Sequence, residues 1–202
     1  MSNKLQNQHL IAPRSHVSKE MREARHNHHG LVVWLTGLSG SGKSTLAHLA
    51  EKALFDKGWN VLVLDGDVIR KGLCKDLGFS PEDRLENNRR VAELARLFML
   101  IGSVCLCAFI SPQEEARRQA RDIAGPEFFR EVYISCSQEE CERRDVKGFY
   151  KKARAGEIRN YTGVSAVYEV PSAPDLTIHT EDAEPEQSAL ELIRFIEKNA
   201  RQ

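Results

Sequence analysis

The chain has 202 residues and a formal net charge of zero, because 29 Lys and Arg are balanced by 29 Asp and Glu. This length suits one domain with a sizeable core, and the charge balance excludes nucleic acid or a membrane surface as a partner held by overall electrostatics. The longest apolar stretch, 97–110, is interrupted by Gly102 and Ser103 and is too short to cross a bilayer, and no N-terminal segment resembles a signal peptide. The five cysteines, an odd number, favour reduced thiols and a cytoplasmic location.

The first 29 residues are polar and contain five of the seven histidines. A histidine cluster can bind a metal ion. We favour a solvated or partly ordered arm instead, since chain ends are commonly loosely held. The sequence therefore predicts a polar arm, 1–29, followed by a single domain, 30–202.

The segment 31–36 is rich in β-branched and aromatic residues and predicts a buried strand. A glycine-rich loop follows it, and apolar residues between 46 and 54 then have helical spacing. The loop fits the GxxxxGK[ST] pattern that cradles the phosphates of nucleoside triphosphates. Its residues are Gly37, Leu38, Ser39, Gly40, Ser41, Gly42, Lys43, Ser44 and Thr45.

This strand–loop–helix arrangement directs backbone N–H groups and the positive end of a helix dipole at one point. We therefore expect the loop to bind ATP or GTP, with Lys43 reaching the β- and γ-phosphates and Ser44 binding Mg²⁺. The alternative is a Gly/Ser turn that matches by chance, and the flanking strand and helix argue against it.

A second apolar run, 61–65, predicts a strand that ends in Asp65, and Asp67 follows two residues later. A carboxylate at such a strand end is suited to hold Mg²⁺ directly or through water, and a second one can serve the acceptor hydroxyl. A turn or a helix cap is the alternative for either aspartate.

The pattern Ser-Pro-Glu-Asp at 80–83 predicts a helix that begins near residue 81. Arg84 and Asn87 share one face of that helix. With Arg70 they form a polar, mostly cationic group, and the planar fork of arginine is suited to phosphate or sulfate.

The segment 103–109 predicts a third strand, and Ile110 and Ser111 follow it. Ser111 opens a second Ser-Pro pattern with Glu at the third following position, which predicts a capping box and another helix start. The segments 131–136 and 176–179 predict two more strands, and 185–202 predicts a helix. The apolar stripe expected to pack that last helix on the sheet is Ala189, Leu190, Leu192, Ile193 and Ile196.

A basic stretch with interleaved aromatic residues runs over 143–154. Such a stretch is also found in nucleic-acid-binding proteins. In a small kinase we interpret it as a lid, about 143–163, that closes over the transferred group and excludes water. Phe79 and Tyr161 are candidates to sandwich a flat ring, and ordinary packing is the alternative for both.

The alternation of strands and helices predicts an α/β domain with a parallel sheet and helices on both faces. Ligands of such sheets bind beyond the carboxyl ends of the strands. The nucleotide loop, Asp65, Asp67 and the Ile110–Ser111 turn all follow strands, so we expect them to converge on one cleft.

At this point the residues closely resemble one family, the adenylylsulfate (APS) kinases, in their bacterial single-domain form. The resemblance covers about 28–180. The matching stretches are GLSGSGKST (37–45), DGDVIR (65–70), LGFSPEDRLENNRR (77–90), FISP (109–112) and RDVKGFYKKARAGEIRNYTGVSAVYEVPSAP (144–174).

The resemblance implies a three-layer P-loop fold of the nucleotide-kinase type. It also implies transfer of the ATP γ-phosphoryl group to the 3′-hydroxyl of adenosine 5′-phosphosulfate in sulfate assimilation, with Mg²⁺ as cofactor and a homodimer as the assembly. Catalysis would depend on Lys43, Asp67 and Ser111, and the metal would be held by Ser44 and Asp65. The implied acceptor-binding residues are Asp67, Arg70, Phe79, Arg84, Asn87, Ile110, Ser111, Lys147 and Tyr161.

Three positions depart from the family pattern. Tyr161 replaces the usual phenylalanine and Phe149 the usual leucine, and both keep an apolar body. Val68 stands where the family often has asparagine, which puts a side-chain contact there in doubt. Bacterial members are commonly described with a phosphorylated serine at the position of Ser111. We favour substrate contact and helix capping for Ser111, since in-line transfer needs no covalent intermediate.

Two other functions remain open at this stage. One is a kinase of the same superfamily that acts on a nucleoside monophosphate or a sugar acid. The other is a GTP-dependent switch without kinase activity. The sequence lacks the Asn-Lys-x-Asp motif that reads guanine, which weakens this second alternative.

Overall fold

The computed structural model describes residues 15–158 and 160–201. Its centre is a sheet of five parallel strands in the order β2-β3-β1-β4-β5. The strands are β1 (Leu31–Thr36), β2 (Val61–Asp65), β3 (Val104–Ala108), β4 (Phe129–Ser135) and β5 (Leu176–His179). All of the predicted strands are confirmed, with ends that shift by at most two residues.

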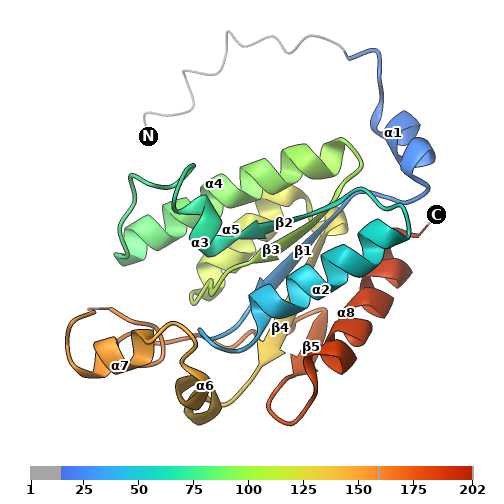
Figure 1. The fold of residues 1–202 in the computed structure, drawn as a ribbon. Helices are drawn as coiled ribbons and strands as arrows, with labels where there is room; N and C mark the ends of the chain where they lie inside the picture. Colours follow the sequence, from blue (N-terminus) through green and yellow to red (C-terminus); the bar gives the residue numbers. More distant parts are fainter. Residues whose placement is uncertain (1–14, 159, 202) are drawn as a thin grey trace, which may run out of the picture.

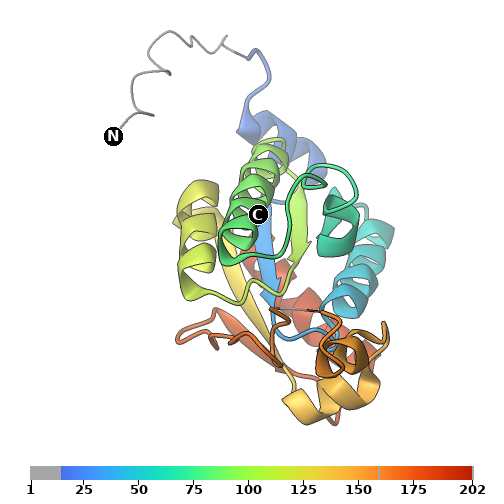
Figure 2. The same cartoon turned by 90° about the vertical axis from the view of Figure 1, so that its left-hand side faces the viewer.

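Helices cover both faces of the sheet, as Figures 1 and 2 show. The helices α2 (Lys43–Asp56) and α8 (Pro185–Ala200) pack together on one face. On the other face lie α4 (Pro81–Leu100) and α5 (Glu114–Ala124). The predicted three-layer α/β fold is therefore confirmed. The short elements are α1 (Lys19–His26), α3 (Gly66–Ile69), the 3₁₀ turn Pro126–Phe128, α6 (Gln138–Arg144) and α7 (Phe149–Arg154).

The central strand β1 shows how the core is divided. Its side chains alternate between the two faces of the sheet, because successive residues of a strand point to opposite sides. Val33 and Leu35 pack with the apolar side chains of α2 and α8. Val32 and Trp34 pack with those of α4 and α5, and the Trp34 ring is fully buried beside Phe109. A strand buried on both faces is therefore apolar along its whole length, as expected for a parallel sheet.

The predicted start of α4 is confirmed: the Ser80 hydroxyl accepts a hydrogen bond of 3.1 Å from the Asp83 amide, and Pro81 is the first helical residue.

In α8, one residue of the predicted apolar stripe is wrong. Leu190 is 51% exposed, whereas Ala189 and Leu192 are buried. The error arises because Leu190 lies next to the stripe but about 100° away from Ala189 around the helix axis.

The end of the N-terminal arm packs against the domain; its first 14 residues lie outside the described residues. The helix α1 precedes His28, whose ring is fully buried and stacks on Trp59 with 4.5 Å between ring centroids. His28 Nε2 accepts a hydrogen bond of 2.9 Å from the Asn60 amide, so Nδ1 is left to donate to the His29 carbonyl at 3.1 Å. These contacts require a neutral ring.

We expect the stability of the fold to fall below about pH 6.5, the ordinary histidine pKa, in part because of His28. Burial lowers its pKa, the nearby His26 and His29 act in the same direction, and the His29 carbonyl and Glu23 oppose them. Between the lowered pKa and the ordinary one, the unfolded chain binds more protons, so the free energy of unfolding decreases as pH falls. Urea unfolding between pH 8 and pH 5 should show this decrease.

His28→Gln should remove part of that pH dependence, and His179→Gln, at an exposed ring in β5, should leave it unchanged. Equal slopes in His28→Gln and in the unaltered chain would contradict the role of His28.

Among the described residues, no helix is both long enough and apolar enough to span a bilayer.

Candidate active site

The glycine loop lies between β1 and α2, at the carboxyl edge of the sheet. Gly42, with φ of 100°, is the N-cap of α2, and no side chain caps that helix. The first amides of α2 are therefore free to bind an anion. A Cβ atom at Gly37 or Gly40 would lie 2.5 Å from the Ile134 carbonyl oxygen or 2.8 Å from the Cys141 carbonyl oxygen. These two positions therefore need glycine for close packing as well as for backbone conformation.

Lys43 is buried and folds back over the loop. Its Nζ donates to the carbonyl oxygens of Gly37 at 2.9 Å and Leu38 at 2.6 Å. Burial lowers the pKa of the Lys43 ammonium to about 8. The group is still mostly charged at pH 7, and its partners are neutral carbonyl groups. A triphosphate in the loop would offer it a stronger, anionic partner.

Ser44 and the two aspartates predicted from the 61–67 segment lie side by side. The Ser44 hydroxyl donates to Asp65 Oδ2 at 2.6 Å, and Asp65 Oδ1 accepts from the Asp67 amide at 2.9 Å. Asp65 is thus the N-cap of α3, which confirms the capping alternative for this residue. Asp67 is left exposed, and its carboxylate makes no hydrogen bond to Ser44 or Asp65 through its own oxygens.

Three side chains that the sequence analysis did not assign support the loop. The Tyr150 hydroxyl donates to the Ser39 carbonyl at 3.0 Å, and the Thr180 hydroxyl donates to the Ser41 carbonyl at 2.8 Å. Arg144 donates to the Thr180 carbonyl at 2.6 Å. Because these donors come from α6, α7 and the end of β5, the shape of the loop depends on parts of the chain that are distant in sequence.

The cationic group predicted around α4 surrounds an exposed aromatic ring. Phe79 is 59% exposed, and the guanidinium carbons of Arg70 and Arg84 lie 4.4 Å and 5.9 Å from its centroid. Arg84 also donates to the Thr162 hydroxyl at 2.9 Å and to the Asn160 carbonyl at 2.6 Å. The arginine therefore joins α4 to the segment that follows α7. Burial lowers the pKa of Arg84, which remains charged at neutral pH.

Asn87 lies one turn further along α4 and is buried. Its Oδ1 atom has no hydrogen-bond partner among the described residues. A buried amide oxygen without a partner is unfavourable and is suited to accept a hydrogen bond from a ligand.

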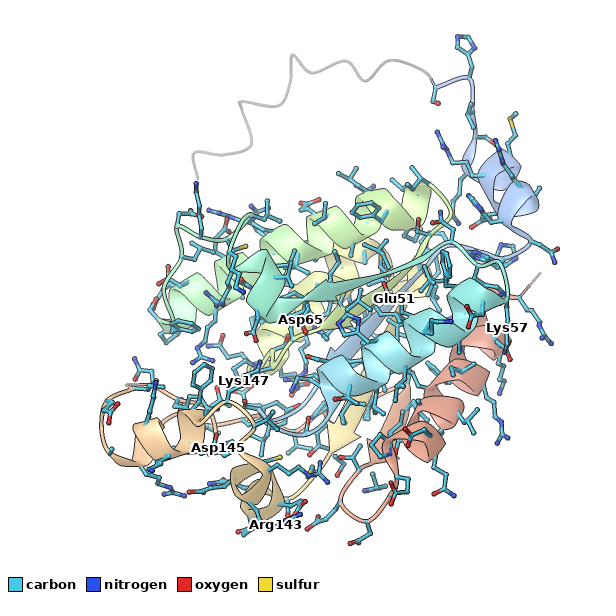
Figure 3. The ribbon with its side chains drawn as sticks, in the orientation of Figure 1. Glu51, Lys57, Asp65, Arg143, Asp145 and Lys147 are labelled. Atoms are coloured by element: carbon cyan, nitrogen blue, oxygen red, sulfur yellow. The ribbon has the colours of Figure 1, made fainter. Side chains whose placement is uncertain are left out.

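The predicted lid, about 143–163, takes in the last residues of α6, the whole of α7 and part of the segment that follows α7. Asp145 accepts hydrogen bonds from the amides of Tyr150 and Lys151, so it fixes the start of α7. From the turn between α6 and α7, the Lys147 ammonium forms an ion pair with the Asp67 carboxylate. Figure 3 shows Lys147 on the side of α7 that faces Asp65, the last residue of β2. The lid is thus in contact with the acidic group of the site.

Tyr161 is only 9% exposed and packs edge-on against Tyr150, with 5.1 Å between centroids. It belongs to an apolar cluster that joins the predicted lid to Cys141 of α6 and to Leu38 of the nucleotide loop. The packing alternative accounts for the position of Tyr161 in this structure, whereas the Phe79 ring is open to a ligand.

The Ile110–Ser111 turn lies between the loop and the aspartates, because β3 is the strand between β1 and β2. The predicted capping role of Ser111 is wrong. The helix α5 begins at Glu114 and has Gln113 as its N-cap. The Ser111 hydroxyl instead accepts a hydrogen bond of 3.0 Å from Trp34 Nε1.

One contact and one backbone angle explain why the Ser-Pro pattern at 111–112 does not cap a helix, whereas the pattern at 80–81 does. The Glu114 amide donates to the Glu169 carboxylate at 2.7 Å, so a distant side chain caps α5. The backbone of Ser111 has φ of 42°, outside the extended region that an N-cap adopts.

Comparison with known proteins adds to this geometry. The family profile described as adenylylsulphate kinase matches residues 29–179. The adenylyl-sulfate kinase of Bacillus pumilus is 45% identical over 197 residues, which cover 98% of this chain and 100% of that protein. That of Staphylococcus epidermidis is 49% identical over 191 residues, or 95% of this chain and 96% of that protein. The chain belongs to the adenylylsulfate kinase family.

Among solved structures, this adenylylsulfate kinase chain is similar to the Mycobacterium tuberculosis APS kinase in complex with AMPPNP and APS. The two are 46% identical with a TM-score of 0.81, over 84% of this chain and 98% of the other. The family and the fold expected from the sequence motifs are thus confirmed.

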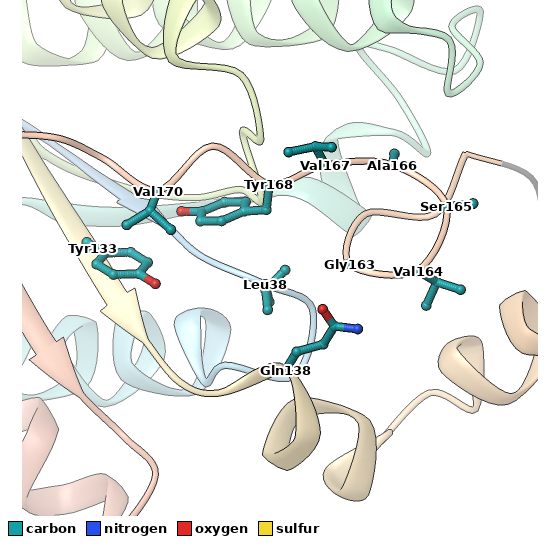
Figure 4. Close-up of a pocket in the computed structure, with 10 residues that line it drawn as sticks. All are labelled: Leu38, Tyr133, Gln138, Gly163, Val164, Ser165, Ala166, Val167, Tyr168 and Val170. Carbon is teal, nitrogen blue, oxygen red and sulfur yellow. The ribbon is translucent and has the colours of Figure 1, made fainter.

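A groove of about 580 Å³ lies beside the loop of this adenylylsulfate kinase (Figure 4). It shares only Leu38 with the loop, and its other lining residues are Tyr133, Gln138, the segment 163–168 and Val170. None of its lining residues is charged. The groove is therefore separate from the charged groups that suit a phosphate, which lie around Lys43 and Asp65.

Proposed function

We propose that this chain transfers the γ-phosphoryl group of ATP to the 3′-hydroxyl of adenosine 5′-phosphosulfate, giving ADP and 3′-phosphoadenylylsulfate. The observation that carries the proposal, beside family membership, is the exposed Phe79 ring flanked by the Arg70 and Arg84 guanidinium groups. An aromatic face next to two cations suits a flat base with an anionic tail. This surface is connected through the lid to the nucleotide loop.

On the nucleotide side, we propose that the loop amides and Lys43 hold the β- and γ-phosphates and stabilise the charge of the transferred group. Lys43 would exchange its carbonyl partners for phosphate oxygens. The expected ATP-binding residues are those of the whole loop, 37–45. In phosphoryl transfer the protein mainly positions groups and stabilises charge, which is what this arrangement of donors offers.

Mg²⁺ is the expected cofactor, and the residues present fit it. The Ser44 hydroxyl and the Asp65 carboxylate provide adjacent oxygen donors, the kind Mg²⁺ prefers, and one or two protein ligands suffice when phosphates and water supply the rest. No cluster of three or more His, Cys, Asp or Glu side chains occurs in the described part of the chain, so this pair is the proposed protein contribution. When bound, the ion neutralises charge on the phosphates.

On the acceptor side, we propose that Asp67 orients the 3′-hydroxyl and accepts its proton. Lys147, which pairs with Asp67 in this structure, would contact the bound acceptor when the lid rearranges. Arg70, Arg84 and Asn87 would hold the phosphosulfate and the ribose, and Phe79 one face of the adenine. Tyr161 can cover the other face only if it leaves its contact with Tyr150.

The test is ADP release with ATP and Mg²⁺ in the presence of adenosine 5′-phosphosulfate, AMP, CMP or gluconate. We expect turnover with adenosine 5′-phosphosulfate alone, because the two arginines can pair with both the phosphate and the terminal sulfate of that acceptor. Equal or better turnover with another acceptor would leave the ATP site in place and overturn the assigned acceptor. No turnover with any of them would contradict kinase activity.

Ser111→Ala is expected to retain substantial activity, with kcat lowered by no more than about tenfold, the size of one lost hydrogen bond. The hydroxyl is buried and accepts the Trp34 indole N–H, which explains the serine without a phosphoenzyme. Incubation of the unaltered enzyme with γ-labelled ATP and no acceptor should leave the protein unlabelled. A labelled phosphoserine that passes its phosphoryl group to the acceptor would establish the covalent route instead.

We also propose that the chain forms a homodimer and acts in the cytoplasm, as the family resemblance implies. Light scattering coupled to size-exclusion chromatography measures the first property directly. A mass equal to one chain would contradict it.

A further inference from the structure

The turn after β3 has a backbone conformation that its own sequence does not favour. Ser111 has φ of 42°, in the left-handed region, although it is not glycine and a proline follows it. Such conformations are rare for L-residues and persist where surrounding contacts hold them. The contacts that hold Ser111 therefore set the shape of this part of the site.

Two of these contacts come from β1. The Trp34 indole donates to the Ser111 hydroxyl at 3.0 Å, and the Thr36 hydroxyl donates to the Ile110 carbonyl at 2.7 Å. Trp34 and Thr36 are two residues apart in one strand, so they lie on the same face of the sheet. This is the face covered by α4 and α5.

The third contact comes from α5. Arg117 is 2% exposed, and its Nη1 donates to the Ser111 carbonyl oxygen at 2.8 Å. Its Nε donates to Glu131 Oε1 at 2.6 Å, an ion pair that fixes the guanidinium group from β4. Its other terminal nitrogen, Nη2, has no hydrogen-bond partner among the described residues. Arg117 is the only charged residue that hydrogen-bonds to the Ser111 backbone within the described residues.

We propose that Arg117 is a positioning residue of the acceptor site: it fixes the Ser111 carbonyl and thereby holds the Ile110–Ser111 turn in the shape that receives the acceptor. The inference rests on the proposed function, in which this turn lines the acceptor pocket. Because β3 lies between β1 and β2, the turn stands between the nucleotide loop and Asp67. Arg117 has no hydrogen bond to the loop, so its effect should fall on the acceptor and not on ATP.

The test is Arg117→Lys, which keeps the charge opposite Glu131 but loses the fork that reaches two partners at once. We expect KM for the acceptor to rise about tenfold, as for the loss of one charge-assisted hydrogen bond. KM for ATP should stay within about twofold, and the melting temperature should change little, because the buried ion pair can re-form. KM is measured for the acceptor that the unaltered chain uses best.

The matched control is Arg121→Lys. Arg121 lies one turn further along α5 and pairs with Asp175 at 2.8 Å, but it has no contact with Ser111. Neither KM should change in this variant. A second variant, Trp34→Phe, removes the other donor to Ser111 while keeping an aromatic ring beside Phe109. It is expected to raise the same acceptor KM.

The outcomes separate this inference from the proposed function. If the unaltered enzyme prefers another acceptor, the assigned substrate is wrong. The effect of Arg117→Lys is then measured as the change in KM for that other acceptor. If Arg117→Lys leaves the acceptor KM unchanged, or raises both KM values together, the positioning role is wrong. A change confined to the melting temperature would show a purely structural role and would also overturn it.

Discussion

Replacing Lys43 with alanine is expected to lower kcat by about 10²- to 10³-fold, the effect of removing one preorganised donor to a developing anion. Lys43 is the buried cation of the loop, and its two shortest hydrogen bonds are to neutral carbonyl oxygens. It therefore has no anionic partner until a triphosphate arrives. Steady-state ADP release gives kcat, and far-UV circular dichroism should show an unchanged fold.

Lys52→Ala is the matched control for this variant. Lys52 lies in the same helix, but it is exposed, and within the described part of the chain its ion pair is with Asp56. Its removal should leave kcat unchanged. A Lys43→Ala enzyme with near-normal kcat would show that the loop amides alone stabilise the transferred group, and the role assigned to Lys43 would be withdrawn.

Asp67→Asn is expected to lower kcat by about 10²- to 10⁴-fold, as for the loss of a general base. The substitution keeps the shape of the side chain and removes the charge that accepts the proton. KM for ATP should change little, because Asp65 and Ser44 hold the metal side of the site without Asp67. Initial rates with both substrates varied would give kcat and both KM values.

Asp67→Asn would also remove the ion pair with Lys147, so its effect on kcat could come from proton transfer or from the lost contact with the lid. Lys147→Met breaks the same pair from the other side and leaves the carboxylate in place. We expect this second variant to raise KM for the acceptor with a smaller loss in kcat. Equal losses in kcat from both variants would assign the effect to the lid contact instead of to proton transfer.

Local patterns predicted most of the fold. The apolar strands, the glycine loop and the cap at Ser80 all depend on residues close together in sequence, and each is observed. The errors occur where distant side chains compete with local preference. Ser111 has the same Ser-Pro beginning as Ser80, yet Trp34, Arg117 and Glu169 supply its contacts and those of α5.

Contacts between distant parts of the chain also explain which residues of the candidate site could not be predicted from the sequence. Motifs identify the residues proposed to contact a ligand, such as Lys43, Asp67 and Phe79. They do not identify the residues that hold these groups in place, because the Thr180 hydroxyl reaches the Ser41 carbonyl from a distant part of the chain and Arg117 is fixed by Glu131 of β4. The burial of Tyr161 against Tyr150 likewise depends on how α7 packs on the loop.

The order of strands has a consequence for how the protein is made. The strand that leads into the nucleotide loop, β1, is the first to be synthesised, yet its neighbours in the sheet are β3 and β4. Such non-local pairing makes folding slow. On the ribosome, β1 therefore stays without one of its partners until β4 has emerged. Because Tyr150 and Thr180 also hold the loop, the capacity to bind ATP should appear only after β5 has emerged, and nucleotide retention by stalled nascent chains would report that step.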